Sequence, residues 1–353
     1  MTVLKLGSLF DGIGVFPLAA VHCGMEPVWA SEIEARPISI TKRHFPDMLH
    51  LGDITKINGA EVPPVDVITF GSPCQDLSQI GTRNGFAGKK SSLFYQAMRI
   101  IEEMRYATNG RYPAFCIWEN VAGAFSSNDR LDFAAMLSAF TGAEVSVPPR
   151  GWAHAGMVRG GRADTAWRLL DAQYWGKPAL AQRRKRVFVV ADFAGQRAGE
   201  VLFKPRTVFP FSAAGGPGGL SATQRGGVPA AQTGRQVPII RPFSLRRMRT
   251  MAQVGDQKGF CASFGRGGEP FPTLLASVTA PFSFWYEGEE SDGFLRVLTP
   301  LECERLMGLP ENWTKYGCKN EEISDHARYR ALGNSIALPC AEYVMAGIAE
   351  VMN

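Results

Sequence analysis

One of the cysteines, Cys74, lies in the segment Gly71-Ser72-Pro73-Cys74-Gln75-Asp76-Leu77-Ser78, directly after an apolar run at Val65–Phe70. A cysteine at the carboxyl end of a strand can have a lowered pKa, because a helix start or nearby cations stabilise the thiolate. A thiolate in that position is a nucleophile. The alternative is a buried structural cysteine, but the flanking residues are polar and turn-forming. The segment therefore favours nucleophilic catalysis.

Two further segments carry charged residues that could assist a nucleophile. Glu119, in Trp118-Glu119-Asn120-Val121, ends an apolar strand, where burial can keep an acid protonated as a donor to a ring nitrogen; it could also be a helix cap. The basic run Gln182–Arg186 enters another apolar strand, and alternation predicts Arg184 and Arg186 on one face. Two such arginines suit a phosphate and a carbonyl oxygen, although a nuclear-import signal or a solvated edge has the same pattern.

A glycine-containing loop follows the first apolar run, at Leu9-Phe10-Asp11-Gly12-Ile13-Gly14. Glycines there let a backbone approach a nucleotide, but the same pattern is common in plain tight turns. Glu32, twenty residues after Gly12, could accept from both ribose hydroxyls, and Asp53 could accept from an adenine amino group. These features suit a nucleotide-derived cofactor and fit an NAD-dependent dehydrogenase equally well.

The elements that position these residues alternate between strand and helix. Short apolar runs occur at 3–10, 28–30, 65–70, 114–118 and 187–191, and helix-like segments lie at 15–23, 33–44 and 92–105. This order predicts an α/β fold with a mostly parallel sheet covered on both faces. Ligands of such sheets bind at the carboxyl ends of the strands, where all the motifs above lie. Further along, Thr299 and Glu302 form a capping-box pattern, and an apolar helix is expected over 336–352.

Composition changes after Asp192. Residues 193–292 hold 15 of the 38 glycines and 9 of the 23 prolines, which predicts a separate domain of loops and short strands. Residues 193–286 contain eleven Lys or Arg against three acidic residues. Such a basic segment is typical of a clamp for a polyanion such as nucleic acid, although a solvated basic surface is the alternative.

Several function classes have no support in the chain. The 353 residues, with 45% hydrophobic and 20% charged residues, predict a folded two-domain protein, and the sequence shows neither a cleavable leader nor an apolar run long enough for a membrane span. The seven cysteines are irregularly spaced, which argues against a disulfide framework and fits the reducing cytoplasm. The absence of CxxC and HxxxH patterns predicts no metal site.

Taken in order, the motifs LFDGIG, SE, GDIT, GSPCQDLS, WENV, QRRKR, LTPLECERLMGLP and LGNSIALP resemble the DNA (cytosine-5)-methyltransferase family of bacterial and phage type. The resemblance extends from Leu6 to Ile348. It implies a Rossmann-like S-adenosylmethionine-dependent methyltransferase fold with a smaller, loop- and strand-rich target-recognition domain. The implied divisions are a catalytic and cofactor-binding domain at 1–192, the recognition domain at 193–295, a connecting helix region at 296–325 and a C-terminal segment at 326–353 that returns to the catalytic domain.

The resemblance also implies a role for each matching position. Cys74 is the nucleophile that adds to C6 of a flipped-out cytosine, Glu119 binds N3 and the N4 amino group, Arg186 binds O2, and Arg184 binds the nearby backbone or Glu119. The segment 75–90 resembles the mobile loop that closes over the base. The residues expected to bind S-adenosyl-L-methionine are Phe10, Gly12, Gly14, Glu32, Ile33, Asp53, Ile54, Pro73, Leu93, Asn334 and Ser335, and those expected to bind DNA are Gln75, Ser78, Arg83, Lys89 and Lys90.

The expected partners are double-stranded DNA and a cognate restriction endonuclease, and the expected form is a monomer. Two other functions have the same motifs. A tRNA cytosine-5 methyltransferase usually has a shorter recognition region, and a non-catalytic regulator usually loses the cysteine or the acid.

The chain departs from the family pattern in two places. Relatives often have small residues or glycine at the positions of Asp11 and Val15, and the segment GKPALAQ before the basic run is longer than the usual GVPQ.

Overall fold

The computed structural model describes residues 2–72, 93–203, 239–243, 271, 273–274, 283–287 and 294–353. The chain divides into two compact units. The first comprises Met1–Leu170, Lys185–Pro205 and Cys340–Asn353, and the second comprises Asp171–Arg184 and Arg206–Pro339.

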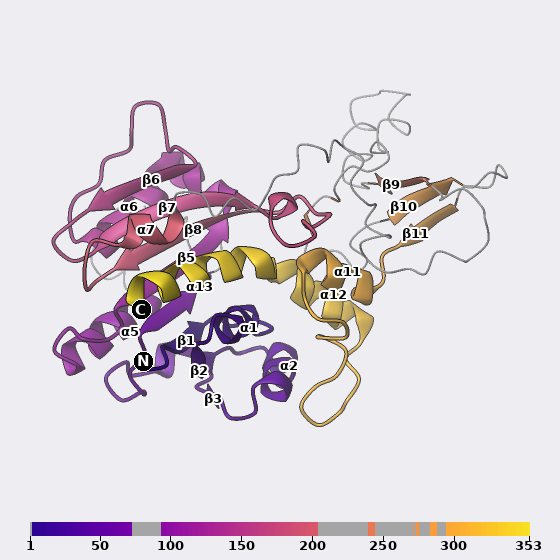
Figure 1. Cartoon of the computed structure of the whole chain (residues 1–353), viewed down its shortest axis with the longest axis horizontal. Helices are drawn as coiled ribbons and strands as arrows, with labels where there is room; N and C mark the ends of the chain where they lie inside the picture. Colours follow the sequence, from indigo (N-terminus) through magenta and orange to yellow (C-terminus); the bar gives the residue numbers. More distant parts are fainter. Residues whose placement is uncertain are drawn as a thin grey trace. The chain divides into compact units, whose positions relative to one another are not determined.

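The first unit is built on an eight-stranded sheet with the strand order β3-β2-β1-β4-β5-β8-β7-β6 (Figure 1). Strands β1 to β5 pair in parallel, whereas β8 runs antiparallel to β5 and β6 runs antiparallel to β7. The predicted α/β fold with a mostly parallel sheet is confirmed. The strands are β1 (Lys5–Leu9), β2 (Glu26–Ser31), β3 (Leu49–His50), β4 (Val67–Phe70), β5 (Phe115–Val121), β6 (Ala155–Arg159), β7 (Asp164–Asp171) and β8 (Lys185–Asp192).

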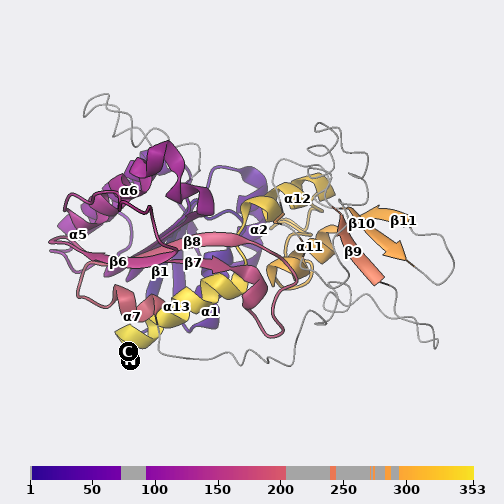
Figure 2. The ribbon, with the colours of Figure 1, turned by 90° about the horizontal axis from the view of Figure 1, so that it is seen from above.

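Helices cover both faces of this sheet. Figure 2 shows α5 (Leu93–Ala107) and α6 (Leu131–Thr141) on one face, and α1 (Val15–His22), α7 (Ala198–Leu202) and α13 (Leu338–Met352) on the other. The core beneath α5 and α6 is aromatic: Phe94 and Phe140 pack against each other and against Phe70 of β4. Burial of this apolar surface is the main force that holds the helices on the sheet. Helix α2 (Ala35–His44) connects β2 to β3.

The C-terminal residues from Cys340 onward belong to the first unit. Within that unit, Glu342 of α13 lies 2.6 Å from the imidazole of His22, and the hydroxyl of Tyr343 is 2.8 Å from the guanidinium of Arg168. No single helix of the described ranges is long and apolar enough to cross a membrane; α12 (Asp325–Asn334) and α13 pass that test of length and composition only when taken together.

The second unit contains a three-stranded antiparallel sheet in the order β11-β10-β9, formed by β9 (Ile239–Phe243), β10 (Ser283–Glu287) and β11 (Phe294–Val297). Helices α11 (Pro300–Met307) and α12 follow. The predicted capping box is present, because Thr299 and Glu302 bind each other's backbone N–H groups, and α11 ends at Gly308 in a left-handed conformation, which favours glycine.

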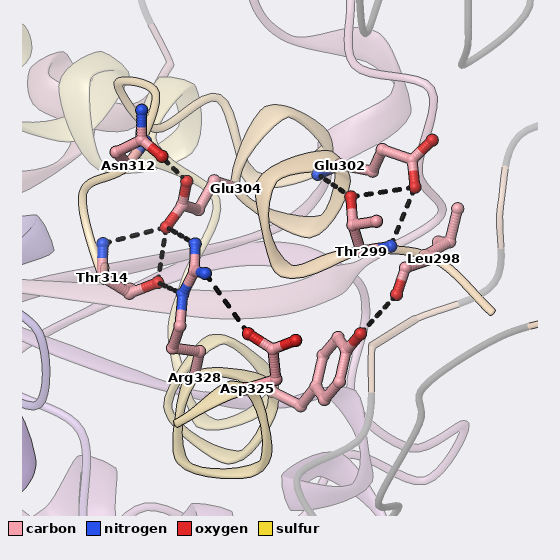
Figure 3. Close-up of polar contacts among 9 residues, drawn as sticks. Leu298, Thr299, Glu302, Glu304, Asn312, Thr314, Asp325 and Arg328 are labelled. Carbon is pink, nitrogen blue, oxygen red and sulfur yellow. Dashed lines mark hydrogen bonds and ion pairs between the residues drawn. The ribbon is translucent and has the colours of Figure 1, made fainter. Parts of the chain in front are cut away.

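A buried ion pair connects α11 to α12 (Figure 3). Oε1 of Glu304 accepts from Nη2 of Arg328 at 3.0 Å, and the two residues are 0% and 6% exposed. The same carboxylate also accepts from the backbone N–H groups of Asn312 and Thr314, and from the Thr314 hydroxyl. All these partners compensate for the removal of the carboxylate from water.

We therefore expect Arg328→Met to destabilise the second unit by roughly 3–5 kcal/mol, since it leaves the Glu304 carboxylate buried without its counter-ion. The loss is to be measured by calorimetric unfolding. The matched control is Arg305→Met, whose partner Glu311 is 59% exposed. That pair should contribute no more than about 1 kcal/mol. Equal losses of stability in the two variants would show that the buried Glu304–Arg328 pair contributes no more than the exposed pair does.

Candidate active site

The loop between β1 and α1 makes a tight turn. Phe10, Gly12 and Gly14 all have positive φ values, of 54°, 59° and 77°. Gly14 is the residue before the first turn of α1, and its N–H donates to the Asp11 carbonyl at 3.2 Å. A left-handed backbone has little cost at the glycines but is uncommon for a phenylalanine. The loop is thus a defined backbone structure at the carboxyl end of the first strand.

Glu32 connects this loop to the end of β2. One carboxylate oxygen accepts from the N–H of Gly12 at 2.9 Å, and the other accepts from the N–H groups of Ile33 at 2.8 Å and Glu34 at 3.0 Å. Three backbone donors fix the orientation of this side chain. The Ile33 side chain beside it is 73% exposed.

The third predicted cofactor segment lies beside β2. The Ser31 hydroxyl donates to the Gly52 carbonyl at 2.6 Å, and the next residue, Asp53, accepts from the N–H and hydroxyl of Thr55 at 2.9 and 2.8 Å. These bonds hold the pKa of Asp53 below its ordinary value. Ile54 is buried, at 4% exposed, and Leu93 is half-buried at the start of α5. The Phe10–Gly14 loop, Glu32 and Asp53 thus lie at the carboxyl ends of the neighbouring strands β1, β2 and β3.

Asp11 is a polar residue of this loop whose importance the sequence did not reveal. Its side chain is 9% exposed and accepts from the Thr41 hydroxyl of α2 at 3.2 Å. Burial raises the pKa of Asp11 to about 7; the hydroxyls of Ser8 and Thr41 oppose this rise, and the charge of Glu32 adds to it. The only sequence signal was that Asp11 stands where relatives often have a smaller residue.

A raised pKa means that the folded state holds the Asp11 proton more tightly than the unfolded state does. Its contribution to stability is complete below pH 3.8, the ordinary value, and is lost as the pH rises through about 7. Relative to Asp11→Asn, the wild type should lose roughly 3 kcal/mol between pH 5 and 8.5.

Thermal unfolding of both proteins at the two pH values checks this expectation. Asp53→Asn is the control: the pKa of Asp53 is lowered, so its contribution is lost only as the pH falls below its ordinary value. The effect of Asp53→Asn should therefore be the same at pH 5 and 8.5. A pH-independent effect of Asp11→Asn would contradict the expectation.

Glu119 lies where β4 and β5 end side by side. Its side chain is 8% exposed, and Oε1 is 2.9 Å from Nε of Arg186 on the antiparallel neighbour β8. A Cβ atom at Gly71 would lie 3.1 Å from Oε2 of Glu119, so the carboxylate lies against the backbone that leads to Cys74. An acid and a guanidinium are thereby held together at the carboxyl end of β4.

The residues on either side of Glu119 fix this arrangement. Nε1 of Trp118 donates to the Ser72 hydroxyl at 3.1 Å, and Nδ2 of Asn120 donates to the Ser72 carbonyl at 3.0 Å. Both bonds join β5 to the residue two positions before Cys74. The sequence alone did not reveal this role of Trp118, Asn120 and Ser72, although two of them belong to the WENV motif.

The two predicted arginines are placed differently. Strand β8 begins at Lys185, so Arg186 lies within the strand and Arg184 is the residue directly before it. Arg186 lies in the first unit, whereas Arg184 lies in the second and is 1% exposed. The Arg184 guanidinium donates to backbone carbonyls, including that of Ser335; Asn334, beside it, is exposed.

Pro73, Cys74, Gln75, Ser78, Arg83, Lys89 and Lys90 lie outside the described residues. Within the described ranges, no group of three or more His, Cys, Asp or Glu side chains could hold a metal ion.

The family model described as C-5 cytosine-specific DNA methylase matches residues 4–205 and 244–350. A protein of Escherichia phage P1 named DNA N-6-adenine-methyltransferase is 24% identical over 98% of the chain, which spans 61% of that protein's length. The type II methyltransferase M.HhaI of Haemophilus parahaemolyticus is 23% identical, with 100% of the chain and 96% of the relative covered.

Among solved structures, a putative DNA modification methyltransferase encoded within a prophage (E. coli) is similar, with a TM-score of 0.59 and 17% identity. The likeness covers 99% of both chains. At that identity it supports the fold of the chain.

Proposed function

Because the chain belongs to the C-5 cytosine-specific DNA methylase family, we propose that it transfers a methyl group from S-adenosyl-L-methionine to C5 of a cytosine in a specific double-stranded DNA sequence. The reaction proceeds through a covalent bond between Cys74 and C6 of the base. The observation that carries the proposal is the Glu119–Arg186 pair, 2.9 Å apart, which lies against the backbone of Gly71, three residues before Cys74.

The first unit has groups that suit this cofactor. Glu32 presents a carboxylate fixed by three N–H donors beside the glycine loop, and a Cβ atom at Gly12 would meet no atom of the described chain within 4 Å. A carboxylate suits ribose hydroxyls, and an open glycine backbone suits close approach of a nucleoside. When bound, the cofactor supplies an electrophilic sulfonium methyl group. The residues that we propose to hold it are Phe10, Gly12, Gly14, Glu32, Ile33, Asp53, Ile54, Pro73, Leu93, Asn334 and Ser335.

The chemistry at the base follows from the difficulty of alkylating an aromatic carbon. The Cys74 thiolate adds to C6, which breaks the ring conjugation and places electron density on C5. Glu119 protonates or holds N3 and accepts from the N4 amino group, while Arg186 donates to O2, so that both favour the addition. After C5 takes the methyl group, its proton leaves to a base such as water, the C5–C6 double bond reforms, and the thiolate is expelled.

A cytosine inside a stacked duplex cannot reach these groups, so the base must be flipped out. We propose that the segment 75–90, with Gln75, Ser78, Arg83, Lys89 and Lys90, contacts the DNA around it. The basic region 193–295 supplies phosphate contacts and sequence recognition. We also propose that the protein is a monomer that acts on DNA in the cytoplasm. Its partner is then a restriction endonuclease of the same sequence specificity.

Bisulfite sequencing of DNA from cells that express the chain tests this function directly. We expect cytosines protected from conversion in one sequence context, and none in cells that carry the empty vector. Transfer of labelled methyl groups to duplex DNA but not to tRNA separates this activity from that of an RNA methyltransferase. Folded protein that binds the cofactor but labels neither substrate would refute the proposal.

A further inference from the structure

A buried arginine, Arg184, holds three separate segments of the second unit together. Its Nη1 donates to the Leu274 carbonyl at 3.0 Å, and its Nη2 donates to the Gly333 carbonyl at 2.8 Å and to the Ser335 carbonyl. The side chain is 1% exposed. A buried guanidinium is costly unless its donors are bound, and its planar fork suits several carbonyls at once.

Two of these carbonyls end a helix. Gly333 lies in the last turn of α12, and Ser335 is the residue directly after the helix. The last carbonyls of a helix have no partner within it and carry a partial negative charge. Arg184 therefore satisfies and neutralises the C-terminal end of α12.

The third carbonyl belongs to a segment of the glycine-rich, basic region. This segment runs beside Arg184: Gln182 and Phe271 form a parallel bridge, the N–H of Arg183 donates to the Phe271 carbonyl at 2.6 Å, and the Thr273 hydroxyl donates to the Arg183 carbonyl at 2.7 Å. The Gln182 side chain, 0% exposed, has no hydrogen-bond partner among the described residues. The backbone bridge, Thr273 and Arg184 thus hold this segment.

Helix α12 has a second point of attachment at its first turn. There Arg328 forms the buried pair with Glu304 shown in Figure 3. The helix is therefore attached to α11 through one arginine and to the 271–274 segment through another. A segment fixed to an anchored helix has a defined position, which base recognition requires.

We propose that Arg184 is a positioning residue for DNA recognition: it fixes the 271–274 segment to α12 and does not touch the reacting cytosine. This inference rests on the proposed function. Arg184 acts on the affinity and sequence choice of the basic region, whereas Arg186, paired with Glu119, acts on the base.

The test compares Arg184→Lys with the wild type in two measurements. Fluorescence anisotropy gives the affinity for a labelled duplex that carries the site mapped by bisulfite sequencing, or for a mixed-sequence duplex if no site is found. Single-turnover methylation at saturating DNA and cofactor gives the rate of the chemical step. We expect about tenfold weaker DNA binding, corresponding to one lost charge-assisted hydrogen bond, a looser sequence choice and an effect on the single-turnover rate that is smaller than the effect on DNA affinity.

Thr273→Val removes the hydrogen bond from the Thr273 hydroxyl to the Arg183 carbonyl and leaves Arg184 in place. This variant tests the inference if Arg184→Lys does not fold. It should weaken DNA binding about threefold. Arg168→Lys is the matched control, because Arg168 binds the Leu202 carbonyl at 2.9 Å in the first unit; its DNA affinity should stay within twofold of the wild type.

Wild-type DNA affinity in both the Arg184 and Thr273 variants would overturn the inference. So would a large fall in the single-turnover rate of Arg184→Lys at unchanged DNA affinity, since that result places Arg184 at the base. Failure of the proposed function is distinct, because the wild type itself then methylates no duplex, whereas failure of this inference is seen in a wild type that methylates DNA and in variants that bind DNA as tightly as it does.

Discussion

Cys74→Ser is expected to abolish methyl transfer while leaving DNA binding intact. A serine hydroxyl is a far weaker nucleophile than a thiolate at neutral pH, so addition to C6 becomes the limiting step. Removal of a covalent nucleophile typically lowers the rate by at least about 10⁴-fold. DNA extracted from cells that express the variant should show complete bisulfite conversion at the sites that the wild type protects.

The matched control is Cys116→Ala. Cys116 is also a strand cysteine, but it is the second residue of β5 and is 0% exposed, and burial raises the pKa of its thiol well above the ordinary value. A buried neutral thiol is inert, so this variant should keep its activity within about threefold. Methylation that survives in Cys74→Ser would disprove the covalent mechanism, whereas loss in both variants would point to a folding defect.

The sequence predicted the sheet because its central strands are buried on both faces and appear as short apolar runs. It did not predict β6, β7 and α6. Strand β6 is an edge strand whose residues alternate between exposed and half-buried, so it lacks a continuous apolar run. Helix α6 begins after Arg130 in a left-handed conformation, without a side-chain cap, so the usual start signal is missing.

To predict where the charged residues lie, the sheet topology is needed as well as the motifs. Strand β8 pairs antiparallel with β5, with Arg186 opposite Val121 and Phe188 opposite Glu119. Glu119 and Val121 point to the same face of the sheet, so Arg186 is the diagonal neighbour of Glu119. A sequence does not reveal which strands are neighbours. For that reason Arg184 and Arg186 looked equivalent, although they belong to different units.

Glu119→Gln is expected to lower the single-turnover rate of methylation by roughly 10²–10⁴-fold, the usual contribution of a positioned acid. Glutamine keeps the volume of the side chain but cannot protonate N3, and its amide has no charge for Arg186, which lies 2.9 Å away. The control is Glu103→Gln, which removes the charge from a half-exposed pair with Arg99 on α5. Because such pairs contribute little, its rate should equal that of the wild type.

Combining Glu119→Gln with Arg186→Lys tests whether the two side chains act together. Residues in direct contact that serve one step are strongly non-additive, since removal of either already removes their joint effect. The double variant should therefore lose little more activity than the worse single variant. If the two losses multiplied instead, Glu119 and Arg186 would act independently, and their pairing across β5 and β8 would serve stability alone. Circular-dichroism melting of the three variants shows whether loss of stability accompanies loss of rate.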